Sequence, residues 1–340
     1  MPAIETRALR KVYPAPAAPK RRRRSAQPER VPAPPSAPPG GAPGEIVALK
    51  GLDLDVHEGE FFGLLGPNGA GKTTTIGILT TRVLATSGSA IVGGANVTTQ
   101  PVQVRQRIGV VPQRPNPDRS LNVVENLVFH AAYFGIPASV AVPRANQLLE
   151  QLSISDKAQA KVDEMSGGQQ QRLMIARALI HEPRVIFLDE PTVGLDPQTR
   201  LSLWEILRTL HAEGRTIVMT THYMEEADKL CDRIAIVDRG ELLELDTPDV
   251  LKRRAPGGTL VEVTLAGTAS DVLEPVRAVS GVLRAEAQGP VLRVYADHGG
   301  RLVSSIIQVA EEHGAPVTNI SLTEPSLETL FVARTGRKLD

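Results

Sequence analysis

The chain contains the motif Gly66-x-x-x-x-Gly71-Lys72-Thr73, which has the residue types and spacing of a phosphate-binding loop. Its glycines let backbone N–H groups turn inward around a phosphate, and the helix that follows adds the positive end of its dipole. In such a loop Lys72 reaches the β- and γ-phosphates, while the Thr73 hydroxyl binds Mg²⁺. The nucleotide-binding residues predicted here are Gly66, Pro67, Asn68, Gly69, Ala70, Gly71, Lys72, Thr73 and Thr74.

Two acidic residues, Asp189 and Glu190, follow the apolar run 185–188. A carboxylate at the end of a buried strand can hold Mg²⁺ through water in a phosphate-loop protein, which suits Asp189. Glu190 is then placed to polarise an attacking water molecule. Together with the loop, this pair predicts hydrolysis of a nucleoside triphosphate.

A third motif, Ser166-Gly167-Gly168-Gln169-Gln170, stands immediately before a pattern typical of a buried helix. Ser166 is a suitable N-cap, and the glycines leave backbone N–H groups exposed at the positive end of the helix dipole. The segment predicts a second anion site, separate from the phosphate loop. Taken alone, it would be read more simply as an ordinary capped helix start.

These motifs together resemble the ATPase subunit of an ABC transporter, whose signature is similar to residues 166–170, with Met165 in place of the more usual Leu. The resemblance implies roles for three more residues. Gln113, 41 residues after Lys72, matches the glutamine that contacts Mg²⁺ and senses the transmembrane partner. Asp196 matches the D-loop aspartate, and His222 matches the switch histidine near the γ-phosphate.

The resemblance also implies how the site works. Two copies close head to tail, and each ATP lies between the phosphate loop of one copy and the signature of the other, so that closure is a population shift driven by ATP. Residues 114–165 pass the movement to a membrane protein. The implied catalytic residues are Glu190, His222 and Gln113; the metal-binding ones are Thr73, Gln113 and Asp189; the further ATP-binding ones are Ser166, Gly167, Gly168, Gln169 and Asp196.

Tyr13 resembles the aromatic residue that stacks on adenine in this family. In the family only a few residues separate that aromatic residue from the next strand. Here residues 14–44 intervene, with ten prolines and the basic run Lys20–Arg24. This composition predicts a disordered insertion, which must loop out if Tyr13 is to stack.

The order of apolar patterns predicts an α/β fold. Strands are expected over 3–12, 52–56 and 60–65, a helix over 73–84, and helical segments over 120–165. Helices and strands then alternate from 166 to 245, which predicts a mostly parallel sheet. After residue 250 the order β-α-β-β-α-β predicts a ferredoxin-like module.

The resemblance implies an ABC-type phosphate-loop domain over residues 1–245. Such a domain combines a mixed sheet with helices, an antiparallel subdomain, and a helical subdomain, here at about 114–180. A small α+β domain should follow over residues 250–340.

Bulk properties narrow the function class. Formal net charge is zero, but residues 1–45 hold nine Lys and Arg against three Asp and Glu, so the remainder is acidic. The single Cys231 excludes an internal disulfide and suits a reducing compartment. No apolar run approaches the length that spans a bilayer, and residues 1–7 lack a secretory signal. We expect a cytoplasmic protein, peripheral on the inner face of the membrane.

Residues 324–331 resemble the closing segment of drug-resistance ATPases that serve ABC-2 exporters. The predicted partners are an ABC-2 permease and a second ATPase subunit, most simply another copy of this chain. An importer ATPase and an ATPase acting on DNA or ribosomes remain as alternatives. The second is disfavoured because 94 residues without heptads separate Lys72 from Ser166, and only one motif set is present.

The basic run Lys20–Arg24 has three interpretations. It is most simply a solvated charge run, and attraction to anionic lipid comes next, at about 1 kcal/mol per basic residue. Nucleic-acid binding is disfavoured because no aromatic residues are interleaved with the charges.

Overall fold

The structure, a computed structural model, describes residues 2–14, 45–255, 258–296 and 299–337. The chain divides into two compact units, Met1–Leu245 and Asp246–Leu339, which are described separately below. Of the predicted insertion, residues 14–44, Pro14 belongs to a strand that pairs with Glu45, and residues 15–44, with the basic run, lie outside the described residues.

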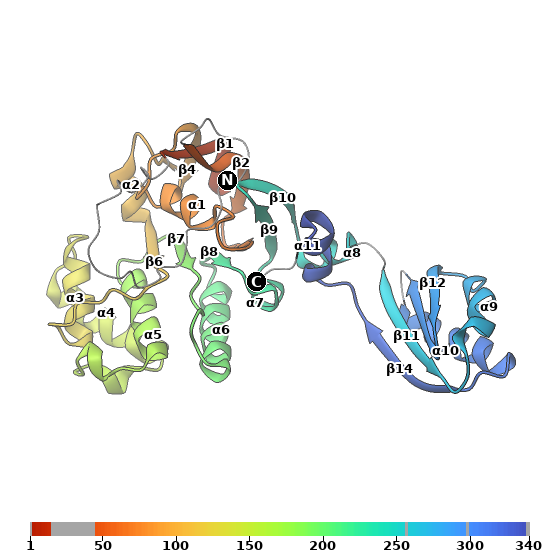
Figure 1. Cartoon of the computed structure of the whole chain (residues 1–340). Coiled ribbons are helices and arrows are strands. Elements are labelled where there is room, and N and C mark those ends of the chain that lie inside the picture. The colour runs from red at the N-terminus through yellow and green to blue at the C-terminus, as the bar shows by residue number, and fades with distance from the viewer. Residues whose placement is uncertain (1, 15–44, 256–257, 297–298, 338–340) are drawn as a thin grey trace, which may run out of the picture. The chain divides into compact units, whose positions relative to one another are not determined.

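The first unit contains two β-sheets and the helices that cover them (Figure 1). Its strands are β1 (Pro2–Pro14), β2 (Glu45–His57), β3 (Phe61–Leu65), β4 (Ser87–Val92), β5 (Ala95–Asn96), β6 (Ile108–Val111), β7 (Val185–Asp189), β8 (Thr216–Thr221), β9 (Arg233–Asp238) and β10 (Glu241–Asp246). Its helices are α1 (Lys72–Leu79), α2 (Pro101–Arg107), α3 (Val123–Ala132), α4 (Ala138–Gln151), α5 (Gly167–Leu179), α6 (Pro197–Ala212) and α7 (Met224–Leu230).

The larger sheet has the strand order β10-β9-β3-β8-β7-β6, and the pairs from β9 to β6 are parallel. Strands β3, β7 and β8 are buried along their whole length. A parallel sheet covered on both faces needs such continuous apolar runs, which explains why these strands do not alternate polar and apolar residues.

The register of this sheet decides where the loops meet. Leu65 of β3 pairs with Thr221 of β8, Thr220 pairs with Asp189 of β7, and Leu188 pairs with Val111 of β6. The carboxyl ends of four adjacent strands therefore lie at one level. The loops that follow them share one edge, where open α/β sheets bind ligands.

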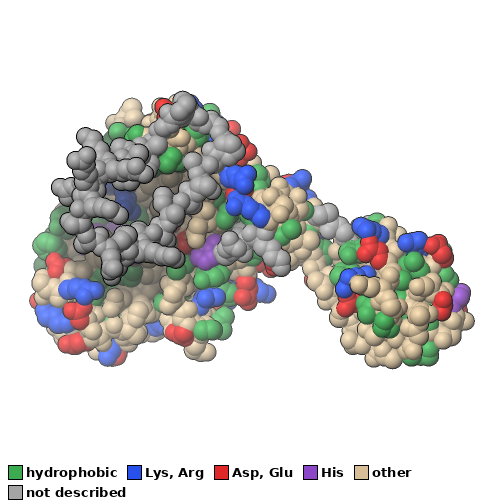
Figure 2. Space-filling view, in the orientation of Figure 1, with side chains coloured by type: hydrophobic (Ala, Val, Ile, Leu, Met, Phe, Trp, Pro, Cys, Tyr) green, Lys and Arg blue, Asp and Glu red, His purple; other side chains and the backbone are tan. Residues whose placement is uncertain are grey.

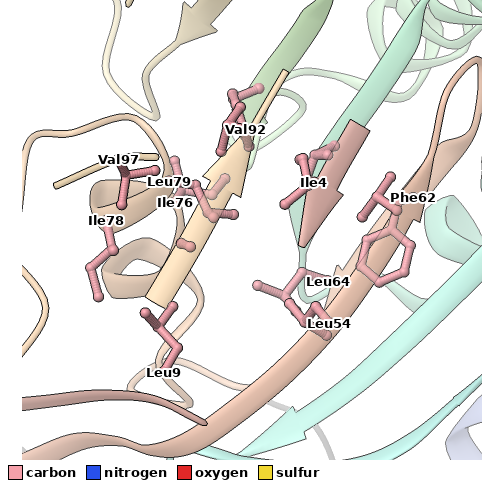
Figure 3. Packing of buried hydrophobic residues seen from close by; sticks show 14 of the residues in the cluster. Ile4, Leu9, Leu54, Phe62, Leu64, Ile76, Ile78, Leu79, Val92 and Val97 are labelled. Atoms are coloured by element: carbon pink, nitrogen blue, oxygen red, sulfur yellow. The ribbon is translucent and has the colours of Figure 1, made fainter. Parts of the chain in front are cut away.

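The smaller sheet is antiparallel, with the order β2-β1-β4-β5. Its apolar side chains pack against β3 and α1, and Figure 3 shows Ile4, Leu54, Phe62, Leu64 and Ile76 converging in this core. The phosphate-loop helix is thus held between the two sheets.

Helix α1 is shorter than the sequence predicts. It ends at Leu79 rather than Leu84, because Thr80 has left the helical region and Thr81 has a positive φ of 63°. The chain then folds back, with the N–H groups of Arg82 and Val83 donating to the carbonyl of Gly77. The prediction of a helix over 73–84 was wrong at its end, since no glycine or proline marks the stop.

Helices α3, α4 and α5 pack on one another in the predicted helical region. Two 3₁₀ turns, Ser155–Lys157 and Val162–Glu164, join α4 to α5. Helix α3 starts with a capping box between Asn122 and Glu125, and α4 starts after Pro137. Caps of this kind satisfy the free N–H groups of a first turn, so the helix boundaries are fixed locally.

The second unit contains a four-stranded antiparallel sheet with the order β12-β13-β11-β14 and two helices, α9 and α10, packed on it. Its elements follow the predicted order β-α-β-β-α-β, and helix α8 packs against α11. The bounds are α8 (Pro248–Arg253), β11 (Thr259–Leu265), the 3₁₀ turn Ala269–Val272, α9 (Leu273–Arg277), β12 (Val282–Gln288), β13 (Val291–Ala296), α10 (Gly299–Glu312), β14 (Val317–Thr323) and α11 (Leu327–Thr335).

The apolar core of this unit lies between the sheet and the helices, and it includes Val261, Val294 and Ile306. Acidic and basic side chains intermingle on the visible face of the unit (Figure 2). One such pair joins neighbouring strands, with Arg293 Nε donating to Glu262 Oε2 over 2.9 Å.

Candidate active site

The phosphate loop runs from the end of β3 to the start of α1. At two of its glycines a side chain would collide with neighbouring backbone. A β-carbon at Gly66 would lie 2.2 Å from the carbonyl oxygen of Val237, in β9. At Gly71 it would lie 2.8 Å from the carbonyl of Ala48, and the φ of 107° there also favours glycine. The neighbouring backbone therefore holds the loop in its tight curve.

A cavity of about 360 Å³ opens beside this loop. It brings together residues from five separate parts of the sequence, among them predicted site residues Tyr13 and Gln113. Below, "nucleotide pocket" means this cavity, which is lined by Tyr13, Ile46, Val47, Ala48, Pro67, Asn68, Gly69, Gly71, Lys72, Thr73, Thr74, Gln113 and Glu190.

Glu190 is the meeting point of three predicted site residues. Its Oε1 lies 3.2 Å from the ammonium nitrogen of Lys72 and 3.5 Å from Nδ1 of His222. Its Oε2 accepts a 2.9 Å hydrogen bond from Nε2 of Gln113. The side chains of Glu190 and Lys72 are only 5% and 4% exposed, so this is a buried ion pair. Removing one partner of such a pair is strongly destabilising.

Burial also acts on the charges around Glu190. It lowers the pKa of Lys72, against the opposing attraction of Glu190 and Asp189. It raises the pKa of Asp189, against the hydrogen bond that the Thr220 hydroxyl donates to Asp189 Oδ1 over 2.6 Å. Both shifts have the same cause, because burial penalises the charged form of each group. Because the site already keeps charged groups away from water, it suits a charged ligand, an anion bound together with its counter-ion.

The backbone at Glu190 is held in an unusual conformation. Its φ is 49°, in the left-handed region that residues other than glycine seldom adopt. Its N–H donates both to the carbonyl and to the hydroxyl of Thr220, over 3.1 and 3.0 Å. Strand β8 thus fixes the direction in which the Glu190 side chain leaves β7.

The signature residues and Asp196 do not line the nucleotide pocket. Ser166 Oγ accepts from the Gln169 N–H, and Gln169 Oε1 accepts from the Ser166 N–H, so the two form a capping box. A β-carbon at Gly168 would lie 2.3 Å from Cγ2 of Thr199. Thr199 in turn donates hydrogen bonds from its N–H and its hydroxyl to the carboxylate of Asp196, the N-cap of α6. The signature and the D-loop position therefore lie beside each other, at the starts of α5 and α6.

Comparison with known proteins identifies the family. Residues 49–193 match the family model described as ABC transporter. The linearmycin resistance ATP-binding protein LnrL of Bacillus subtilis is 37% identical over 298 residues, which cover 87% of this chain and 96% of the relative. The daunorubicin resistance ATP-binding protein DrrA2 of Streptomyces coeruleorubidus is 41% identical over 301 residues, which cover 87% and 93%. The chain belongs to the ABC transporter ATP-binding proteins.

The relatives of this ABC ATPase include drug-resistance and export subunits. A Nod factor export ATP-binding protein of Ralstonia nicotianae is 40% identical over 298 residues, 87% of this chain and 91% of the relative. Among solved structures, the ATP-binding cassette MJ0796, a dimer in a post-hydrolysis state with ADP and Pi, aligns with a TM-score of 0.59 and 26% identity. It covers 72% of this chain and 98% of its own. The predictions of the family, the fold and an ATPase activity are thereby confirmed.

Sequence reasoning missed several residues of the ABC ATPase site. Thr220 is not among the predicted site residues, although its hydroxyl contacts both Asp189 and the N–H of Glu190. A threonine at the end of the strand that precedes His222 was the available signal. Arg177 of α5 was also missed; its guanidinium donates to the carbonyl and to the side-chain oxygen of Asn116, three residues after Gln113.

Two further expectations concern membrane-spanning segments and the single cysteine. None of the helices that the structure describes has the length and apolar character needed to cross a membrane. Cys231 packs as a small buried group beside Gly63, and burial raises the pKa of its thiol.

Proposed function

We propose that this chain is the ATP-hydrolysing subunit of an ABC-2-type exporter. The observation that carries the proposal is the convergence of Lys72, Gln113 and His222 on Glu190 beside the phosphate loop. In this assignment Glu190 polarises the attacking water, His222 contacts the γ-phosphate, and Lys72 exchanges its contact with Glu190 for the phosphates of ATP.

The residues present fit a magnesium ion. Thr73 Oγ1 lies 3.5 Å from Asp189 Oδ1, so hydroxyl and carboxylate oxygens already face each other at the pocket, with the amide of Gln113 nearby. Mg²⁺ prefers such oxygen ligands and keeps part of its water shell. We assign Thr73, Gln113 and Asp189 to the ion. When bound, it would neutralise charge on the β- and γ-phosphates.

The site is completed by a second copy in this proposal. Tyr13 stacks on the base, and residues Gly66 to Thr74 hold the phosphates of one subunit's ATP. Ser166, Gly167, Gly168, Gln169 and Asp196 of the other subunit cover the γ-phosphate. Support comes from their position: the start of α5 presents the positive end of a helix, and its residues do not line the nucleotide pocket of their own chain.

The proposed setting is the cytoplasmic face of the membrane, with an ABC-2 permease as the partner and no role for nucleic acid. The names of the relatives, which record drug resistance and Nod factor export, support export over import. The second unit, residues 250–340 in the predicted division, would serve as an accessory domain.

Affinity isolation of the full chain from solubilised membranes tests this proposal. The expected result is one integral membrane protein in stoichiometric amount, with ATPase activity in the isolated complex. Copurification with ribosomes or DNA, and no integral partner, would contradict export. A substrate-binding protein bound to the same permease would instead indicate an importer.

A further inference from the structure

Glu226 is an acidic residue buried inside the first unit. It belongs to α7, four residues after His222, and its exposed fraction is 0%. One carboxyl oxygen, Oε1, accepts a 3.2 Å hydrogen bond from the indole Nε1 of Trp204 in α6. A buried carboxyl group is costly unless its surroundings compensate for the water it has lost. The groups around the Glu226 carboxyl therefore indicate which parts of the fold it connects.

Several polar groups near this carboxyl lack a well-formed partner. Among the described residues, Oε2 of Glu226, Oγ1 of Thr192 and Nε of Arg200 are buried without a hydrogen-bond partner. The same side chains still act on one another: burial raises the pKa of Glu226, while Thr221, Thr192 and Trp204, and the charge of Arg200, oppose the rise. The carboxyl is thus a shared neighbour of groups from separate segments.

Each of these segments also carries a residue of the proposed active site. Thr192 is two residues after Glu190, and Thr221 directly precedes His222. Trp204 belongs to α6, whose N-cap is Asp196.

A second contact joins the same two helices. The guanidinium of Arg200 lies 4.6 Å from the ring centre of Tyr223, and that ring lies 4.2 Å from the ring of His222. The contact between α6 and the segment that carries His222 therefore does not depend on the Trp204 hydrogen bond alone.

We propose that Glu226 is a positioning residue of the ATPase site. By accepting the Trp204 hydrogen bond, it ties α7, in the segment after β8, to α6, in the segment after β7. That arrangement keeps Nδ1 of His222 within 3.5 Å of Glu190. Glu226 does not line the nucleotide pocket, so it acts through His222 and not on ATP. The inference rests on the proposed role of His222.

The test compares Glu226→Leu with Glu226→Gln in the full chain, using steady-state ATP hydrolysis. Leucine fills the space but removes the acceptor of the Trp204 bond, and we expect kcat to fall about tenfold with KM for ATP within about twofold. Glutamine keeps an acceptor oxygen at the same position and should retain at least half of the wild-type kcat. Equal losses in both variants, or a rise in KM without a change in kcat, would overturn the proposal.

A double-mutant cycle with His222→Ala separates positioning from general destabilisation. If Glu226 acts through His222, Glu226→Leu should lower kcat by less than twofold in the His222→Ala background. A full tenfold loss in that background would overturn this inference alone. A His222→Ala variant with wild-type kcat would instead refute the proposed role of His222.

Trp204→Phe keeps the experiment decisive if the leucine variant does not fold. It removes the indole donor while leaving Glu226 in place, and the same loss of kcat, again dependent on His222, is expected. Thermal unfolding of each variant shows whether it is folded at the assay temperature. A folded Trp204→Phe variant with wild-type kcat would overturn the proposal.

Discussion

The nucleotide pocket and the signature segment, residues 166–170, satisfy their polar groups in different ways. In the pocket, buried charges contact one another: Glu190 has Lys72, Gln113 and His222 within 3.5 Å. In the signature segment, Ser166 and Gln169 form a capping box at the exposed start of α5. In the pocket, burial disfavours the charged forms of Lys72 and Asp189. In the signature segment, the capping box already satisfies the polar groups of Ser166 and Gln169.

This difference separates two kinds of mutational effect. Changes in the pocket should alter chemistry and the stability of the first unit together, because the same buried contacts serve both. Changes in the signature segment should leave the isolated chain intact and act only when a second copy is present. The predictions below test that separation, beginning with the largest expected effect.

Glu190→Gln should lower turnover about 1000-fold, within the range that a general base contributes. Glutamine keeps the size of the side chain and can still contact Gln113, so ATP should bind and hold two copies together. Phosphate release and light scattering with ATP measure the two effects. Glu150→Gln, at an exposed position of α4, is the control and should behave as wild type. A variant that stays monomeric with ATP would contradict the assignment.

Gly167→Asp should lower turnover about 100-fold through charge repulsion of the partner's ATP. A β-carbon at Gly167 meets nothing within 4 Å, and a carboxylate is favourable in a first turn, so the fold should be unaffected. Binding of ATP to the isolated chain, followed by fluorescence titration, should change less than twofold.

Gly300→Asp provides a matched control for this substitution. It places the same residue in the first turn of α10, also in open space, and should retain wild-type turnover. Weaker ATP binding by the isolated Gly167→Asp chain would show that the signature segment belongs to its own pocket.

Thr220→Val should lower turnover about tenfold and the free energy of unfolding by about 1–3 kcal/mol. It removes the hydroxyl that contacts both Asp189 and the Glu190 N–H. Thr216→Val, at the other end of β8, removes a hydroxyl that accepts from Gly59 and should cost similar stability without loss of turnover. Urea unfolding and ATP hydrolysis give the two values. Equal turnover in both variants would show that the Thr220 contacts are structural only.

The last prediction concerns stability and not turnover, at His130 in α3, which packs against the signature helix α5. Burial, with the charges of Arg177 and His181, lowers the pKa of His130 to about 4. The folded state therefore binds fewer protons than the unfolded state between pH 4 and 6.5, and stability falls as the pH falls through that window. This group should cost about 2 kcal/mol between pH 7 and pH 5.

His130→Leu should remove that part of the pH dependence, as urea unfolding at the two pH values would measure. His313→Leu, at an exposed site in α10's following turn, is the control and should keep it. If the pH dependence of His130→Leu equals that of the wild type, the His130 cluster is not its source.

Much of the nucleotide pocket follows from local patterns in the sequence. The apolar runs before Gly66 and Asp189 predict parallel strands, and parallel strands place their following loops at one edge. The capping of α5 by Ser166 was equally local. By contrast, contacts between distant segments, such as Arg177 with Asn116 and Gly168 with Thr199, leave no spacing signal. The early end of α1 at Leu79 also depends on the backbone at Thr81, which no residue type announces.

The left-handed backbone at Glu190 restricts which residues evolution could place there. Isoleucine, valine and threonine are branched at Cβ and would crowd that conformation. Glycine, asparagine and aspartate adopt it most readily, yet glycine removes the carboxylate and aspartate shortens its reach by one methylene. The backbone thus favours small residues, while the contacts with Lys72, Gln113 and His222 require a long acidic one. Replacement of glutamate at this position is therefore opposed by two independent constraints, the backbone conformation and the contacts of the carboxylate. Few residues would satisfy both.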